Sequence, residues 1–154
     1  MLQKKVESAA KPYTSNSFTM RISLINEEPI MIKMVSGFLT DLGHEVTSFS
    51  SIPQFLSDKS DSTRPAEVIL IDLSMSEGKN IQVIRDIHRR FPESRIIVMS
   101  TVLPAEEAIS HGVYAYFDMP INLSKLELII LRIKELCGDS IFKSGNGGED
   151  GKEV

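Results

Sequence analysis

The sequence contains no tryptophan, and its 154 residues include only one cysteine, Cys137. A lone thiol forms no internal disulfide, which excludes a disulfide-stapled secreted scaffold and indicates a reducing compartment. No apolar run approaches the roughly 18 residues that a membrane span requires. No apolar stretch follows the N-terminal lysines, so a secretory signal is not predicted either. These absences predict a cytoplasmic protein without a membrane partner.

Basic residues are also in the minority. The chain has 17 Lys+Arg against 21 Asp+Glu, a net charge of −4. This balance argues against nucleic-acid binding through bulk charge, so no nucleic-acid partner is predicted for this chain. A glycine-rich phosphate-binding turn is missing as well, and no nucleophile–base pair stands out. The sequence therefore predicts no enzyme acting on a separate small substrate.

The two ends of the chain differ in composition from the middle. Residues 1–17 are polar and without periodicity, and they are predicted to form a flexible N-terminal arm. Residues 143–154, KSGNGGEDGKEV, are predicted to be a flexible Gly-rich tail, or a linker within a longer parent protein. The remaining residues, 18–142, have the size of one domain.

Five short apolar runs within this domain predict strands. They are rich in β-branched residues, and helical patterns separate them. The third and fourth runs have no polar interruption, which is typical of strands buried on both faces of a parallel sheet. The five runs are Ile22–Ile25, Val46–Phe49, Val68–Ile71, Ile96–Met99 and Val113–Phe117.

Apolar residues at helical spacing predict five helices between and after these runs. Gly43 is expected to end the first helix, and Ser51 with Gln54 is expected to form a capping box at the start of the second. The alternation predicts an α/β fold with a doubly wound five-stranded parallel sheet and helices on both faces. The expected strand order is the flavodoxin-like 2-1-3-4-5.

Function in such a sheet lies beyond the carboxyl ends of the strands. Four polar or special positions occur there: Asn26-Glu27 after the first strand, Asp72 after the third, Ser100 after the fourth and Met119-Pro120 after the fifth. This set, in this order, resembles the receiver domain of two-component response regulators. The resemblance covers roughly residues 21–136 and implies a phosphorelay signalling role.

The resemblance assigns a role to each position. Asp72 stands at the place of the phosphoacceptor, which receives its phosphoryl group from a histidine kinase, and Ser100 at the place of the hydroxyl that bonds the phosphoryl oxygen. Asn26, Glu27 and Asp72, with the backbone carbonyl of Ser74, stand at the place of the Mg²⁺ ligands. Tyr116 stands at the place of the fifth-strand aromatic residue that reports the phosphorylation state in the family. Packing alone is the alternative role for this ring.

The sequence departs from the family pattern at the site. Asn26 replaces an acid, Met119 replaces the lysine before the proline, and Thr101 is larger than the usual residue after the hydroxyl position. We therefore expect a weak or absent Mg²⁺ site. Two functions stay open: a receiver with Asp72 as phosphoacceptor, or a phosphorylation-independent pseudo-receiver that acts as a protein interaction module. Asp72 serving only as a turn cap is a third, structural interpretation.

The output surface is predicted to lie on the fourth helix, fifth strand and fifth helix. The fourth helix, around residues 104–109, is weakly patterned and is expected to be mobile. The fifth helix has surplus apolar residues, Leu123, Leu128 and Leu131, which predict a contact with a histidine kinase, another signalling protein or a second copy of the chain.

Overall fold

The structure is a computed structural model that describes residues 19–59, 65–74, 81–101 and 104–137. The chain divides into two compact units, and Met20–Leu123 forms the unit that contains the sheet. No helix among the described residues is long and apolar enough to cross a membrane. The predicted arm at 1–17 and the predicted tail at 143–154 lie outside the described residues.

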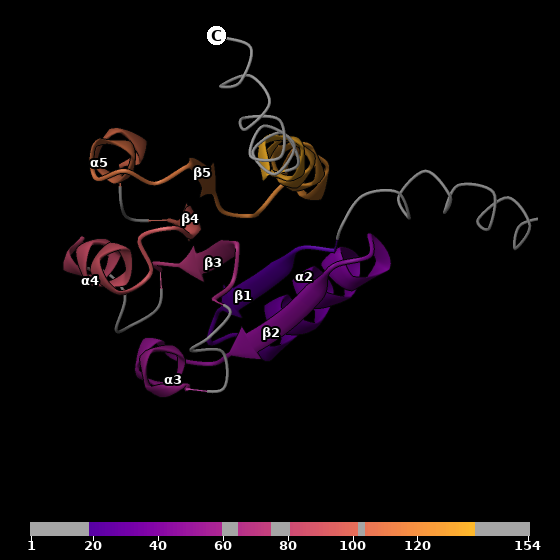
Figure 1. Ribbon diagram of the computed structural model, residues 1–154, viewed down its shortest axis with the longest axis horizontal. Helices are drawn as coiled ribbons and strands as arrows, with labels where there is room; N and C mark the ends of the chain where they lie inside the picture. Colours follow the sequence, from indigo (N-terminus) through magenta and orange to yellow (C-terminus); the bar gives the residue numbers. More distant parts are fainter. Residues whose placement is uncertain (1–18, 60–64, 75–80, 102–103, 138–154) are drawn as a thin grey trace, which may run out of the picture. The chain divides into compact units, whose positions relative to one another are not determined.

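Five parallel strands make one sheet in the order β2-β1-β3-β4-β5, which confirms the predicted topology (Figure 1). Each neighbouring pair is parallel. Parallel strands need crossover connections, and the intervening helices supply them. The strands are β1 (Arg21–Ile25), β2 (Glu45–Phe49), β3 (Val68–Asp72), β4 (Arg95–Ser100) and β5 (Ala115–Asp118).

The two central strands are buried on both faces, as their uninterrupted apolar sequences predict. Every residue of β3 is buried, and in β4 only Arg95 is partly exposed. The edge strand β2 behaves differently, because only Phe49 of its five residues is buried. The sheet therefore has its most protected backbone at β3 and β4, next to the carboxyl edge that positions Asp72.

Helices cover both faces of the sheet. Figure 1 shows α3, α4 and α5 on one side and α2 on the other. On the α3–α4–α5 side, the strand residues Ile69 and Ile71 belong to one buried apolar cluster with Phe55 of α3, Ile84 of α4 and Ala108 of α5. The helices are α2 (Pro29–Asp41), α3 (Ile52–Ser57), α4 (Gln82–Arg90) and α5 (Ala105–Ser110).

Local sequence signals account for the ends of α2 and α3. Gly43 follows α2 with φ = +98°, a left-handed conformation that glycine adopts readily, so the predicted stop is confirmed. At α3 the Ser51 Oγ accepts the Gln54 N–H at 3.1 Å, as a capping box requires. The return bond differs from the prediction, since Gln54 Oε1 accepts from the N–H of Ser50 (2.7 Å).

The second unit contains the predicted last helix, which spans residues 123–137. Leu126, Ile130 and Ile133 are buried at helical spacing. Leu128 is 65% exposed and Leu131 is 38% exposed. The surplus apolar side chains of this helix are thus accessible at two of the three predicted positions, Leu123 being half-buried.

Candidate functional site

Three polar residues meet at the carboxyl edge of the sheet, as the topology predicts. Asp72 ends β3, Ser100 ends β4, and Asn26 directly follows β1. The register pairs Ile25 with Ile71, so Asn26 and Asp72 are the next residues on two neighbouring strands. Asn26 and Ser100 are fully buried and Asp72 is 6% exposed. Three buried polar side chains within an apolar sheet mark this edge as the candidate site.

Asp72 organises the loop that follows it. Its Oδ1 accepts the backbone N–H of Ser74 at 2.7 Å, the geometry of an Asx turn. Ser74 Oγ in turn accepts the N–H of Thr101 at 2.9 Å, and Thr101 Oγ1 lies 3.2 Å from the same oxygen. The turn-cap interpretation of Asp72 is therefore part of its role. The network also ties the loop after β3 to the end of β4.

Asn26 also forms an Asx turn, but its turn bond fixes the orientation of its own amide group. Its Oδ1 accepts the N–H of Glu28 at 2.8 Å. Because an N–H group needs an oxygen acceptor, this bond sets the orientation of the amide. Among the described residues, the amide nitrogen Nδ2 is buried and has no hydrogen-bond partner. Buried donors in this state are rare in proteins, so Asn26 is an unusual position of the candidate site.

Two other predicted site residues, Glu27 and Met119, are less buried than Asn26, Asp72 and Ser100. Glu27 is exposed and lies just before α2. Met119 is half-buried and precedes Pro120 through a cis peptide bond. Within the described ranges no group of three or more His, Cys, Asp or Glu side chains is arranged to hold a metal ion. The carboxylates at this edge include those of Asp72 and Asp118, which end β3 and β5, and of Glu27, which follows β1.

Tyr116 packs against the buried cluster on the α3–α4–α5 side of the sheet and is half-buried. Its hydroxyl donates to the backbone oxygen of Ser100 at 3.3 Å, which connects β5 to the candidate site. Burial raises the pKa of Tyr116, and the neighbouring Asp118 carboxylate raises it further, while the Ser100 hydroxyl acts in the opposite direction. The ring is therefore held neutral beside the site, and a switching role remains a prediction.

One contact of the site was not predicted from the sequence. The Ser74 hydroxyl bonds the backbone and hydroxyl groups of Thr101 across two strand ends, whereas the prediction used only the carbonyl of Ser74. The available signal was local: Asp72 and Ser74 stand two apart, as do Asn26 and Glu28, and both pairs form Asx turns. Which strand end such a turn would contact depends on the sheet.

The family model described as "Response regulator receiver domain" matches residues 22–131 of the chain. A putative NtrX-like response regulator of Rickettsia conorii is 26% identical over 118 residues, which cover 75% of this chain and 25% of that protein. The transcriptional regulatory protein CitT of Bacillus subtilis is 25% identical over 118 residues, 75% of this chain and 48% of that protein. The chain thus spans between a quarter and half of the length of these relatives.

Solved structures share the fold. NtrX of Brucella abortus, crystallised with ADP, superposes with a TM-score of 0.69 at 21% identity, over 83% of this chain and 29% of that one. A CheY-like receiver domain protein of Methanospirillum hungatei gives a TM-score of 0.67 at 17% identity, over 79% of this chain and 99% of that one. At these identities the likeness concerns the fold alone.

Proposed function

The protein belongs to the response regulator receiver domain family, and from this membership we propose that it works as a pseudo-receiver: its output is contact with another protein and does not require phosphorylation of Asp72. Receiver domains are modules of two-component signalling. This member would carry a signal through protein contact alone. The proposal is supported by the uncharged Asn26, whose buried Nδ2 has no hydrogen-bond partner in the part of the chain that the structure describes.

Receiver domains generally bind Mg²⁺ at their acidic edge. A magnesium ion needs several oxygen ligands in near-octahedral arrangement. Here the Asn26 oxygen already accepts the N–H of Glu28, and an uncharged amide is a weaker ligand for a cation than the acid that the family has at this position. Asp72 has one oxygen engaged by Ser74, and Glu27 is exposed. These residues do not fit the ion in this arrangement.

The missing cations matter because of the chemistry of phosphoryl transfer. A carboxylate that attacks phosphorus approaches several negative oxygens, so catalysis depends on positioning and charge neutralisation. Met119 occupies the position of the family lysine and carries no charge. The N–H of Thr101 is already bonded to Ser74 Oγ and offers no ready donor to a phosphoryl oxygen. Phosphorylation of Asp72 is therefore expected to be slow.

The second candidate function keeps Asp72 as the phosphoacceptor, with Ser100 as the hydroxyl donor, Tyr116 as the switch and a histidine kinase as the phosphodonor. The burial of Asp72 at the end of β3 favours it, because a carboxylate is costly to bury without a purpose. In this function Asp72 would still be phosphorylated, but slowly, because the uncharged Asn26 and Met119 replace charged residues of the family.

A phosphodonor experiment separates the two functions. The full chain is incubated with acetyl phosphate, with and without MgCl₂, and its intact mass is measured. We expect no added phosphoryl group on the wild type, and a restored Mg²⁺-dependent addition in the double variant Asn26→Asp, Met119→Lys. Mg²⁺-dependent addition to the wild type that disappears in Asp72→Asn would establish the second function instead.

The partner surface of the pseudo-receiver is proposed to include exposed apolar side chains of the last helix. Leu128 in this helix is 65% exposed. A cytoplasmic signalling protein or a second copy of the chain is the proposed partner. Sedimentation velocity of the wild type and of Leu128→Ser tests the homodimer: a concentration-dependent dimer that the substitution weakens supports it, and a monomer throughout excludes it.

A further inference from the structure

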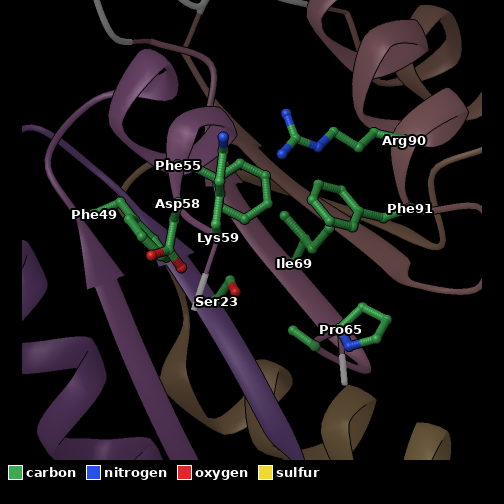
Figure 2. A pocket seen from close by; sticks show the side chains of 10 residues that line it. Ser23, Phe49, Phe55, Asp58, Lys59, Pro65, Ile69, Arg90 and Phe91 are labelled. Carbon is green, nitrogen blue, oxygen red and sulfur yellow. The ribbon is translucent and has the colours of Figure 1, made fainter. Parts of the chain in front are cut away.

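A cavity of about 210 Å³ lies on the α3–α4 side of the sheet, away from the candidate site. Figure 2 shows the side chains around it, which come from β1, the end of β2, α3, the start of β3 and the end of α4. Ser23 and Ile69 form its floor, at paired positions of β1 and β3. Asp72, by contrast, lies at the far end of β3, at the carboxyl edge.

The cavity follows from the shortness of α3. This helix has six residues, Ile52–Ser57, and is about 9 Å long. The five-residue strands beneath it extend over about 16 Å. Since α3 runs back from the carboxyl edge, it ends before it has covered the amino-terminal half of β1 and β3. Among the described residues, the helix thus leaves the space above Ser23 uncovered.

Ser23 is the polar feature of this floor. It is 6% exposed and has apolar neighbours in the strand on both sides, Ile22 and Leu24. Among the described residues no hydrogen bond to its hydroxyl is formed, and Figure 2 shows this oxygen at the floor of the cavity. The hydroxyl is reached through the cavity that Ser23 lines. A ligand in the cavity can therefore form a hydrogen bond with it.

Aromatic rings form one wall. Phe49 and Phe55 contact edge to face with ring centroids 5.2 Å apart, and Phe55 and Phe91 follow at 5.3 Å. All three line the cavity. A series of rings in these arrangements presents both edges and faces, to which another aromatic ring packs well. An engineered apolar cavity of about 150 Å³ holds one benzene ring, so this cavity has room for a single ring with a small substituent.

Of the charged residues that the structure describes at the rim, two are basic and one is acidic. Lys59 and Arg90 are exposed, and Asp58 is half-buried. In Figure 2 the Lys59 amine and the Arg90 guanidinium lie at the same side of the opening, while the Asp58 carboxylate lies toward Phe49. The Arg90 guanidinium also stands 5.4 Å from the ring centroid of Phe91, which keeps it near the aromatic wall.

We propose that this cavity is a binding site for a small aromatic carboxylate, whose ring contacts Phe49, Phe55 and Phe91. Its polar substituent bonds the Ser23 hydroxyl, and its negative charge faces Lys59 and Arg90. An apolar body with a few placed polar groups is the usual composition of a ligand pocket. The site is independent of Asp72, so it gives the domain an input that phosphorylation chemistry does not supply.

The test is a titration of the ¹⁵N-labelled full chain with benzoate, followed by two-dimensional NMR. We expect saturable shifts of the Ser23, Ile69 and Phe91 amides, and weaker binding of benzyl alcohol and of acetate, which lack the charge and the ring respectively. Absence of saturable shifts at these amides with millimolar benzoate overturns the proposal. Equal binding of acetate overturns the role of the aromatic wall.

Two substitutions with matched controls locate the site. Ser23→Val replaces the hydroxyl and fills the floor, and it is expected to weaken benzoate binding by about tenfold or more. The control Ser48→Val lies on β2, at an exposed position paired with Leu24, and should bind as the wild type does. Unchanged binding by a folded Ser23→Val variant overturns the proposal.

The charge of the rim is tested at neighbouring arginines. Arg90→Gln should weaken benzoate binding by about threefold, the size expected for an exposed charge pair, and leave benzyl alcohol unaffected. Arg89→Gln is the control, because Arg89 is also exposed on the same helix but pairs with Asp86 at 3.6 Å and does not line the cavity. Equal effects of both substitutions on benzoate contradict an anion-binding rim.

Discussion

At the carboxyl edge of the sheet Asp72, Ser74 and Thr101 bond to one another, whereas nearer the amino edge the Ser23 hydroxyl faces a cavity. Both regions bury polar groups on the same central strands. In the first region, side chains and backbone groups of neighbouring strand ends bond to one another. The second region has a hydroxyl, an aromatic wall and space. On the two proposals above, this receiver would recognise a ligand at the second region and would not depend on a metal ion at the first.

The largest effect is expected at Asn26, whose Nδ2 is buried without a hydrogen-bond partner among the described residues. Asn26→Asp places a charge in a fully buried position near Asp72 and should lower the free energy of unfolding by about 2–4 kcal/mol. Thermal unfolding with and without MgCl₂ measures it. The wild type should ignore Mg²⁺, and the variant should be stabilised by it. A magnesium-induced rise in Tm of the wild type would contradict the absence of a fitted metal site.

Ser100→Val tests whether the carboxyl edge depends on its polar groups. Ser100 is fully buried at the end of β4, and its hydroxyl acts on Tyr116. Removing a satisfied buried hydroxyl should lower the free energy of unfolding by about 1–2 kcal/mol. Urea denaturation followed by circular dichroism measures it. An increase in stability would show that this edge tolerates apolar replacement.

A serine-to-valine substitution at the cavity should change the free energy of unfolding in the opposite direction. Ser23→Val removes a hydroxyl without a partner and adds buried methyl groups, so it should raise the free energy of unfolding by about 1 kcal/mol. The same denaturation experiment applies. If Ser23→Val and Ser100→Val destabilise the protein equally, the contrast between the two regions is wrong.

The smallest effect concerns Tyr116. Asp118→Asn removes the charge that raises the pKa of Tyr116 and alters the hydrogen bond that also raises it, so this pKa should fall but stay above its ordinary value, because burial is the largest cause. A raised pKa favours the neutral form in the folded state. Its contribution to stability is therefore full below the unfolded pKa and is lost as pH rises through the folded one. Ultraviolet titration with Tyr116→Phe as the reference measures the shift, and an unchanged midpoint would show that Asp118 is not a cause.

Much of the fold follows from local patterns in the sequence. The uninterrupted apolar runs of β3 and β4 indicated central strands, and the alternation of strands and helices was enough to predict the order 2-1-3-4-5. Gly43 ended its helix as expected. Only the boundaries differed by one or two residues, since strand ends depend on the pairing partner: Asp72 and Ser100 joined their strands because β4 and β5 lie alongside.

The positions of Asn26, Asp72 and Ser100 at one edge were predictable too, because parallel strands bring their carboxyl ends together. The sequence did not predict which atoms of these residues are already engaged in hydrogen bonds. The Asn26 amide is oriented by a turn bond to Glu28, and Thr101 is bonded to a serine 27 residues earlier. Such bonds compete with contacts to a ligand. Whether they form depends on how the strand ends lie relative to one another in three dimensions.

The sequence by itself determined the sheet, its order and the chemical types gathered at its carboxyl edge, since periodicity and strand-end residues are encoded locally. The tertiary structure decided which polar groups are satisfied. Ser23 stands in an apolar run and looked like an ordinary strand residue, and it became the floor of a cavity only because α3 is too short to cover it. Hydrogen-bond satisfaction and empty space are properties of packing between distant segments, which no local pattern records.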